Sequence, residues 1–166
     1  MLKSVKAQKI QAGNGRFAIV ASKYNARYVD AMLRAAKAEL TRAGADKIRV
    51  VRVPGAYEIP VVVKALARAT LGQASRITHH APRFSAIICL GVILRGQTVH
   101  AEHIGQAVSQ ALMQIQVESG IPVIHEVLLL ENEAQAQARC LGKKYNRGTE
   151  AARTALAMAG VMASLH

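Results

Sequence analysis

The segment that most limits what this chain can fold into is residues 84–93, FSAIICLGVI, which is apolar at nearly every position. A strand with one face in water alternates polar and apolar residues, so an unbroken apolar run of this length is typical of a strand covered on both faces. Such strands occur in parallel sheets, whose crossover connections are usually helices. The run therefore predicts an α/β domain.

Other segments of the chain alternate between strand and helix patterns. Three further apolar runs predict strands at 16–22, 47–53 and 122–130. The predicted helices run from Asn25 to near Gly44, from about Glu58 to Arg68, along the stripe from Ile104 to Ile115, and over about 133–141 and 149–163. This order predicts a three-layer α/β/α fold with a four-stranded parallel sheet, doubly wound in the flavodoxin-like manner, with helices on both faces.

The chain length predicts one domain, because 166 residues are too few for two sizeable cores. Residues 1–15 lack periodicity and are expected to form an N-terminal arm, so the domain is expected to span 16–166. Four strands are few for an isolated α/β domain, which favours oligomerisation. The connection at 70–83 is long for a helix-to-strand loop.

The formal net charge of +12 raises the question of an anionic partner: nucleic acid, an acidic membrane or a phosphorylated small molecule. The basic residues are spread through foldable segments instead of forming a low-complexity block, and residues 101–135 carry five acidic side chains and no Lys or Arg. Aromatic residues make up 4% with no Trp, which argues against stacking platforms for single strands. We expect no specific nucleic-acid partner and no membrane partner.

Several other classes of protein do not fit the sequence. No apolar run approaches the ~20 residues that span a bilayer, and residues 1–15 contain no apolar stretch like that of a secretory signal, so a cytoplasmic location is expected. Cys89 and Cys140 provide neither a disulfide framework nor a zinc cluster, and Cys89 is expected to be buried. The pair His79-His80 and His103 lack carboxylate partners, so no metal site is predicted.

Ligands of open α/β sheets bind beyond the carboxyl ends of the strands, which selects residues 22–25, 53–58, 94–100 and those after Leu130. In the third segment, Gly96, Gln97 and Thr98 lead from a strand into a helix. Exposed backbone N–H groups at a helix start favour phosphate. The imidazole of His100 can move protons beside a bound anion. The alternative is a helix-capping Thr beside a surface His.

The remaining candidates each have a structural alternative. Asn25 is expected to cap a helix. Tyr24 can stack on a planar ring or simply pack, and Glu58 can bind sugar hydroxyls or serve as an acidic first-turn residue. Arg139 can pair with phosphate or with the acidic segment. The basic cluster at 143–147 is usually a solvated bend.

Five segments, in order, resemble those of the 6,7-dimethyl-8-ribityllumazine synthase family of riboflavin biosynthesis. They are 21–25 (ASKYN), 53–60 (VPGAYEIP), 90–100 (LGVILRGQTVH), 135–139 (QAQAR) and 146–152 (NRGTEAA). The resemblance covers roughly residues 16–160. VPGAYEIP and LGVILRGQTVH together are specific, since neither is a general α/β signature.

The resemblance implies an enzyme that condenses 5-amino-6-(D-ribitylamino)uracil with 3,4-dihydroxy-2-butanone 4-phosphate. Imine formation, phosphate loss, ring closure and dehydration follow without a metal or organic cofactor. The family forms pentamers, in some cases twelve of them in a hollow shell, with active sites between adjacent subunits. Riboflavin synthase is a further candidate partner.

The resemblance also implies a role for individual residues, with His100 as the catalytic proton-transfer residue. The implied phosphate-binding residues are Gln97, Thr98 and, from a neighbouring subunit, Arg139. The implied substrate-binding residues are Tyr24 stacking on the uracil ring, Asn25 beside it, Ala56, Tyr57 and Glu58 on the ribityl chain, and Val92, Ile93, Leu94, His125 and Arg147.

Several positions depart from the family pattern. His125-Glu126 replaces a Phe-Gly pair whose ring covers the uracil from the adjacent subunit, and Ala101-Glu102 replaces an aromatic-acidic pair after the histidine. Arg147 replaces a Lys, and Leu129-Leu130 replaces a Thr-rich strand end. These departures leave open a non-catalytic ligand-binding or shell-forming protein that keeps the fold. A nucleic-acid-binding protein is supported by the charge alone.

Overall fold

A single parallel sheet organises the chain, and the computed structural model describes residues 12–70, 83–142 and 145–165. The strands are β1 (Arg16–Ser22), β2 (Lys47–Val53), β3 (Ala86–Leu94) and β4 (Val123–Leu130). They lie in the order β2-β1-β3-β4, and all three neighbouring pairs are parallel. The predicted four-stranded parallel sheet is confirmed.

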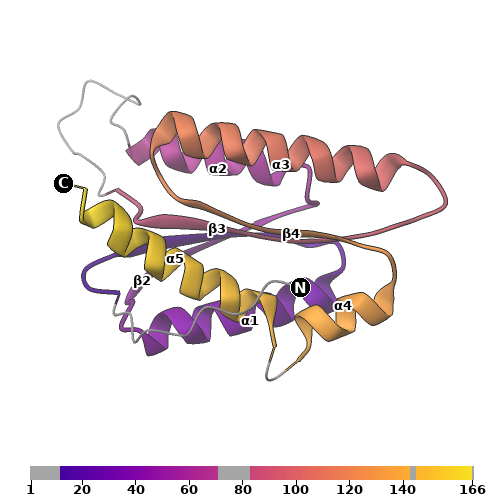
Figure 1. The fold of residues 1–166 in the computed structure, drawn as a ribbon, viewed down its shortest axis with the longest axis horizontal. Helices are drawn as coiled ribbons and strands as arrows, with labels where there is room; N and C mark the ends of the chain where they lie inside the picture. The colour runs from indigo at the N-terminus through magenta and orange to yellow at the C-terminus, as the bar shows by residue number, and fades with distance from the viewer. Residues whose placement is uncertain (1–11, 71–82, 143–144, 166) are drawn as a thin grey trace.

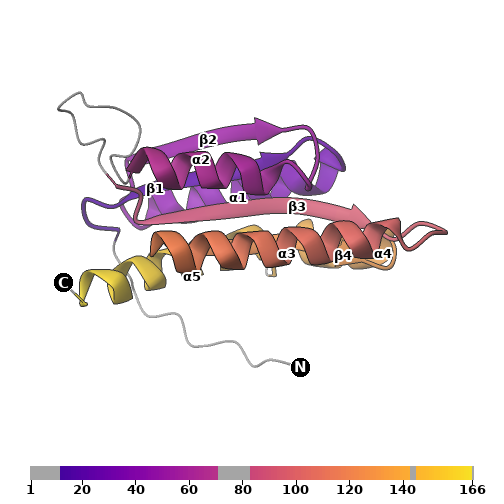
Figure 2. The same cartoon turned by 90° about the horizontal axis from the view of Figure 1, so that it is seen from above.

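Five helices cover the two faces of the sheet. They are α1 (Ala26–Arg42), α2 (Ile59–Thr70), α3 (His100–Ser119), α4 (Glu133–Cys140) and α5 (Arg147–Ala163). Helices α1, α4 and α5 lie on one face, and α2 and α3 lie on the other (Figure 1). Seen from above, α2 lies over the half of the sheet that contains β2 and β1, and α3 over the half that contains β3 and β4 (Figure 2). The three-layer, flavodoxin-like fold is confirmed.

The apolar runs are buried as their patterns indicate. In β3, residues 86–92 are all buried, and β1 is buried from Phe17 to Ser22. Two apolar cores result, one between the sheet and α1, α4 and α5, and one between the sheet and α2 and α3. Cys89 lies in the second core as a free thiol, as predicted, and burial raises its pKa. Burial at about 25 cal/mol per Å² of apolar surface is the main force that holds the layers together.

Most boundaries differ from the predicted ones by one or two residues, whereas α3 extends four residues beyond each end of the predicted stripe from Ile104 to Ile115. Helix α5 begins at Arg147 instead of residue 149, because Asn146 is its N-cap and its side-chain oxygen accepts a hydrogen bond from the Gly148 N–H at 2.9 Å. Strand β3 begins at Ala86 instead of residue 84, and β4 at Val123 instead of Pro122. The prediction that Asn25 caps α1 with its side chain is wrong: Asn25 has a left-handed φ of 54° and makes no side-chain cap.

Some predictions fall largely outside the described residues. Most of the long connection at 70–83, with His79 and His80, is among them, and so is the expected N-terminal arm as far as residue 11. At the described end of that arm, the Ala12 N–H donates to the Ala43 carbonyl at 2.8 Å. Among the helices of the described ranges, none is long and apolar enough to cross a membrane.

Candidate functional site

The carboxyl ends of the four parallel strands meet at one edge of the sheet, and the connections to α1, α2, α3 and α4 start there (Figure 1). This edge collects most of the predicted site residues. They are Tyr24, Asn25, Ala56, Tyr57, Glu58, Val92, Ile93, Leu94, Gln97, Thr98 and His100. The geometry of an open parallel sheet therefore brings together segments that are far apart in sequence.

The loops after β1 and β2 pack directly against each other. The Tyr24 N–H donates to the Pro54 carbonyl at 3.0 Å. A Cβ on Gly55 would lie 3.0 Å from Cδ2 of the Tyr24 ring, so the glycine lets that ring approach the second loop closely. Oε2 of Glu58 accepts from the Gly55 N–H at 2.9 Å and holds the turn. Tyr24 remains 71% exposed, and its ring is available to a planar ligand.

Asn25 fixes the first loop to the centre of the sheet. Its Nδ2 donates to the Val92 carbonyl of β3 at 2.8 Å. The left-handed backbone of Asn25 turns the side chain toward β3, which explains why it does not cap α1. Asn25 therefore positions Tyr24 relative to the end of β3.

The loop after β3 is the most exposed part of this edge. Residues 95–100 are all exposed, and α3 begins at His100. The His100 N–H donates to Oγ1 of Thr98 at 3.4 Å, but the N-cap of α3 is Val99 and the helix has no side-chain cap, so Thr98 does not cap it as the alternative predicted. Arg95 forms ion pairs with Glu102 and Glu131, which tie the loop to α3 and to the end of β4. The ion pairs of Arg95 therefore anchor the start of the loop, and Gln97, Thr98 and His100 are exposed to solvent beyond it.

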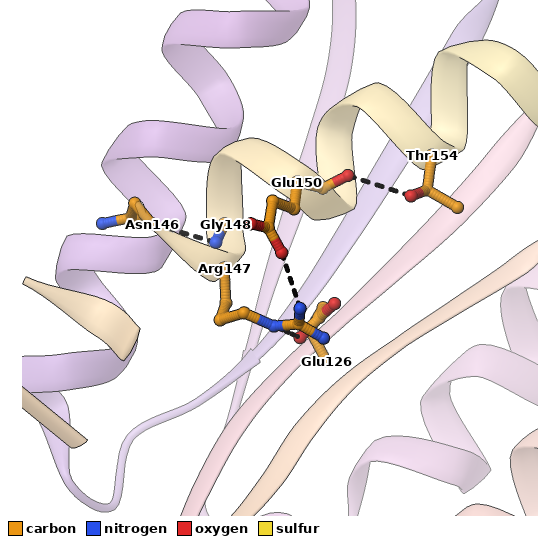
Figure 3. A network of polar contacts seen from close by, with 6 residues as sticks. All are labelled: Glu126, Asn146, Arg147, Gly148, Glu150 and Thr154. Atoms are coloured by element: carbon orange, nitrogen blue, oxygen red, sulfur yellow. Dashed lines mark hydrogen bonds and ion pairs between the residues drawn. The ribbon is translucent and has the colours of Figure 1, made fainter. Parts of the chain in front are cut away.

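Two adjacent residues of β4 face opposite sides of the sheet. His125 is exposed, and its Nε2 lies 2.8 Å from Oγ of Ser109 on α3. Glu126 is buried, with 6% of its surface exposed, and its Oε2 accepts from Nε of Arg147 at 3.0 Å (Figure 3). Burial raises the pKa of Glu126 to about 7, and the positive charge of Arg147 opposes that rise.

Arg147 bridges two carboxylates. Its Nη1 donates to Oε2 of Glu150 at 2.6 Å, one turn along α5, while Nε binds Glu126 on β4 (Figure 3). A guanidinium has five N–H donors in a fixed fork, so these two bonds leave others that are able to bind a ligand. Arg147 is thus part of a structured network and not of a solvated bend.

One chain does not bring all predicted site residues together. His125 lies opposite Cys89 in the strand register, five residues before the Leu94–Leu130 pair at the carboxyl edge. At about 3.3 Å per residue, that separation is roughly 16 Å. Arg139 is exposed on α4, and none of the ion pairs found within the described ranges involves it, so its predicted pairing with the acidic segment is not seen.

Two contacts were not predicted from the sequence: Ser109 with His125, and Glu126 with Arg147. A signal for the second existed, since a glutamate inside the run PVIHEVLLL must find a partner when the strand is buried. The first had no comparable signal, because a serine on an exposed helix face is ordinary. Among the described residues, no group of three or more His, Cys, Asp or Glu side chains is arranged to hold a metal ion.

The sequence model of a family described as 6,7-dimethyl-8-ribityllumazine synthase matches residues 14–163, which is nearly the whole chain. The chain belongs to the 6,7-dimethyl-8-ribityllumazine synthase family. The match spans every strand and helix described above, so the carboxyl edge of the sheet is part of a lumazine synthase fold.

Curated relatives agree with this assignment. The chain is 40% identical to a 6,7-dimethyl-8-ribityllumazine synthase of Xanthomonas oryzae pv. oryzae strain PXO99A over 149 residues, which cover 89% of each chain. It is 39% identical to the protein of the same name from Xylella fastidiosa strain M12 over 158 residues, or 94% of this chain and 95% of the relative. Membership in the lumazine synthase family implies a place in riboflavin biosynthesis.

Proposed function

We propose that this protein condenses 5-amino-6-(D-ribitylamino)uracil with 3,4-dihydroxy-2-butanone 4-phosphate to give 6,7-dimethyl-8-ribityllumazine. The observation that carries the proposal is the exposed loop of Gln97, Thr98 and His100 at the same edge of the sheet as Tyr24 and Glu58, on a chain of this family. The loop offers backbone N–H groups at the start of α3, where an anion is favoured.

The reaction balances without a redox step. The primary amine attacks the ketone carbonyl and the imine forms with loss of one water. The carbon next to the imine loses its proton, the C–O bond to phosphate breaks, and phosphate leaves with the electron pair. The enol that results takes up a proton and becomes a ketone. The ribityl-bearing amine attacks this ketone and closes the ring, and a second water is lost. Each step requires proton movements and charge stabilisation, for which no metal or organic cofactor is proposed.

The residues of the carboxyl edge divide these tasks. Gln97, Thr98 and the loop amides bind phosphate, and His100 moves protons beside it. Tyr24 stacks on the uracil ring and is positioned by Asn25, whose side chain binds the Val92 carbonyl. Val92, Ile93 and Leu94 form the end of β3 at this edge and contact the ligand. Glu58 uses Oε2 to hold Gly55, so its Oε1 accepts from ribityl hydroxyls, next to Ala56 and Tyr57.

Arg139, His125 and Arg147 act in this proposal on the ligand of an adjacent subunit. The roughly 16 Å between His125 and the carboxyl edge of its own sheet supports this arrangement. The protein is therefore expected to be a homo-oligomer, either a pentamer or a shell of sixty subunits, with riboflavin synthase as a candidate guest.

Light scattering tests the assembly directly. The expected mass is five or sixty times that of the 17.8-kDa chain, because the proposed site needs residues from two subunits. Size-exclusion chromatography with static light scattering at two protein concentrations gives that mass. A stable monomer would contradict the shared site.

His100→Ala is expected to lower kcat by about 10-fold or more, the low end of general acid–base effects, since imine chemistry proceeds in part unaided. The measurement mixes the purified protein with both substrates and follows the lumazine absorbance. His103→Ala is the matched control, because His103 is exposed on the same helix and has no proposed role. Lumazine formation by the wild-type protein no faster than the uncatalysed background would overturn the proposed function.

A second candidate is a protein that binds ribityl ligands without turnover. The observation that favours it is the Glu126–Arg147 pair, since the carboxylate occupies one donor of an arginine proposed to bind substrate. Calorimetry beside the rate assay separates the two: binding of the lumazine without its formation selects the second candidate.

A further inference from the structure

His125 is exposed at the edge of the sheet, but its ring has a defined partner. Oγ of Ser109 lies 2.8 Å from Nε2 of His125 and also 2.8 Å from the Gly105 carbonyl oxygen, one turn earlier on α3. Both distances are within the range of ordinary hydrogen bonds. Helix α3 therefore holds a side chain that would otherwise rotate freely in water.

Counting protons fixes the direction of each bond. A carbonyl oxygen only accepts, so the single hydroxyl proton of Ser109 is donated to Gly105. The hydroxyl oxygen must then accept in its contact with His125, which means that Nε2 of the imidazole carries a proton. In the neutral ring, the other nitrogen, Nδ1, is then an acceptor.

An open groove of about 450 Å³ lies next to this pair, between α3 and β4. Ser109 lines it together with Gly105, Val127 and Leu129 and with the polar residues Arg95, Glu102, Gln106 and Gln110. His125 is on the same face of β4 as Val127 and Leu129, since alternate strand residues share a face. None of the hydrogen bonds found in the described part of the chain uses Nδ1.

We propose that Ser109 is a positioning residue that holds His125 as its Nε2–H tautomer, so that Nδ1 accepts the ring N–H of the pyrimidine ligand bound by the adjacent subunit. This inference rests on the proposed function, which places that ligand against β4. A uracil-type ring carries an imide N–H between two carbonyls, directed outward in the plane of the ring, and a hydrocarbon side chain at this position would have no acceptor for it. His125 would thus determine specificity for an unsubstituted imide.

Magic-angle-spinning NMR of the full-length protein labelled with ¹⁵N-histidine tests the tautomer without any ligand. The expected spectrum shows a protonated Nε2 and an unprotonated Nδ1 for His125, assigned by its loss in His125→Phe. Ser109→Ala is expected to give a mixture of both tautomers. Thr154→Val is the matched control, because the Thr154 hydroxyl also donates to a carbonyl one turn earlier, that of Glu150, on an exposed helix face. An Nδ1–H tautomer in the wild-type protein would overturn the proposal.

Calorimetry with 6,7-dimethyl-8-ribityllumazine and its imide N-methyl derivative tests the ligand bond. The wild-type protein is expected to bind the parent about 10-fold more tightly than the derivative, whereas His125→Phe should bind both within about twofold. Ser109→Ala is expected to weaken binding of the parent about threefold to fivefold, with Thr154→Val unchanged. Equal discrimination by the wild-type protein and His125→Phe, or no binding of the parent at all, would contradict the proposal.

Neither measurement needs turnover, so the two proposals fail separately. If the protein shows the Nε2–H tautomer and the discrimination but forms no lumazine, this inference stands and the proposed function is contradicted. If it forms lumazine while Nδ1 of His125 is protonated, only the role proposed for Ser109 and His125 is contradicted.

Discussion

Gly148→Ala is expected to destabilise the protein by about 3 kcal/mol or more, the largest effect of any change considered for this chain. A Cβ at Gly148 would lie 2.0 Å from the Met32 carbonyl oxygen and 2.6 Å from its carbonyl carbon. These are backbone atoms of α1, so no side-chain rotation relieves the overlap. The substitution must push α1 and α5 apart.

The packing around this contact makes separation costly. Helix α5 faces α1 with small, fully buried residues: Ala151, Ala152 and Ala155. Small side chains allow the two helices to approach closely, and moving the helices apart would leave space that no nearby group fills. The φ angle of Gly148 is not in the left-handed region. Glycine is therefore required here because the backbone of α1 lies so close, and not because of the backbone conformation of residue 148.

Urea unfolding of Gly148→Ala and Gly160→Ala measures the effect with an internal control. Gly160 is on the same helix, and a Cβ there would meet no atom within 4 Å. Alanine at Gly160 is expected to stabilise the helix by up to about 1 kcal/mol. All samples need one protein concentration, because assembly contributes to apparent stability. Equal midpoints for Gly148→Ala and the wild-type protein would show that the α1–α5 contact is looser than described.

The strands and layers were predictable from the sequence because burial on both faces leaves an unmistakable pattern. Residues 84–93 have no polar alternation, and β3 is buried at all positions from Ala86 to Val92. Helix starts were harder to predict, because capping depends on side-chain direction. Asn25 and Asn146 both precede helices, yet only Asn146 caps its helix, while Asn25 reaches Val92 across the sheet. Composition and spacing do not distinguish these two outcomes.

The arrangement of the candidate site residues was predictable where it depends on the ends of the strands, and unpredictable where it depends on which side chains contact one another. A parallel sheet brings loops such as 23–25 and 54–58 to one edge whatever their sequences are. In contrast, the partners of His125 and Glu126 lie on α3 and α5, 16 and 21 residues away in the chain. The register of the strands and the rotation of each helix about its axis decide which polar groups meet across the layers. Neither can be read from a single sequence.

The Glu126–Arg147 network should make stability depend on pH with an unusual sign. The pKa of Glu126 is about 7 in the folded protein, against 4.5 for an unperturbed glutamate, because burial disfavours the charged form. Between those two values, the folded state binds more protons than the unfolded state. Stability therefore falls as the pH rises through this window. The contribution of Glu126 to the free energy of unfolding is fully present below pH 4.5 and is lost above pH 7.

Glu126→Gln removes this dependence while keeping an acceptor for Nε of Arg147. Relative to the wild-type protein, the variant is expected to gain about 2 to 3 kcal/mol between pH 5 and pH 8. The charged groups around Glu126 are Arg147 and Glu150 on α5 and Arg139 on α4, and all three remain in the variant. Ionisable groups elsewhere in the chain are the same in both proteins, so their contribution cancels in the difference.

Glu39→Gln provides the opposite case for the same unfolding measurements. Glu39 is buried and its pKa is lowered to about 2, mainly by its hydrogen bond from Arg42, with burial opposing and Arg153 adding to the effect. The stability it contributes is present above pH 4.5 and is lost only as the pH falls toward 2. The difference between Glu39→Gln and the wild-type protein should therefore stay constant between pH 5 and pH 8. A difference for Glu126→Gln that is equally constant would show that the Glu126 carboxyl stays ionised throughout this range, which requires that Arg147 outweighs burial.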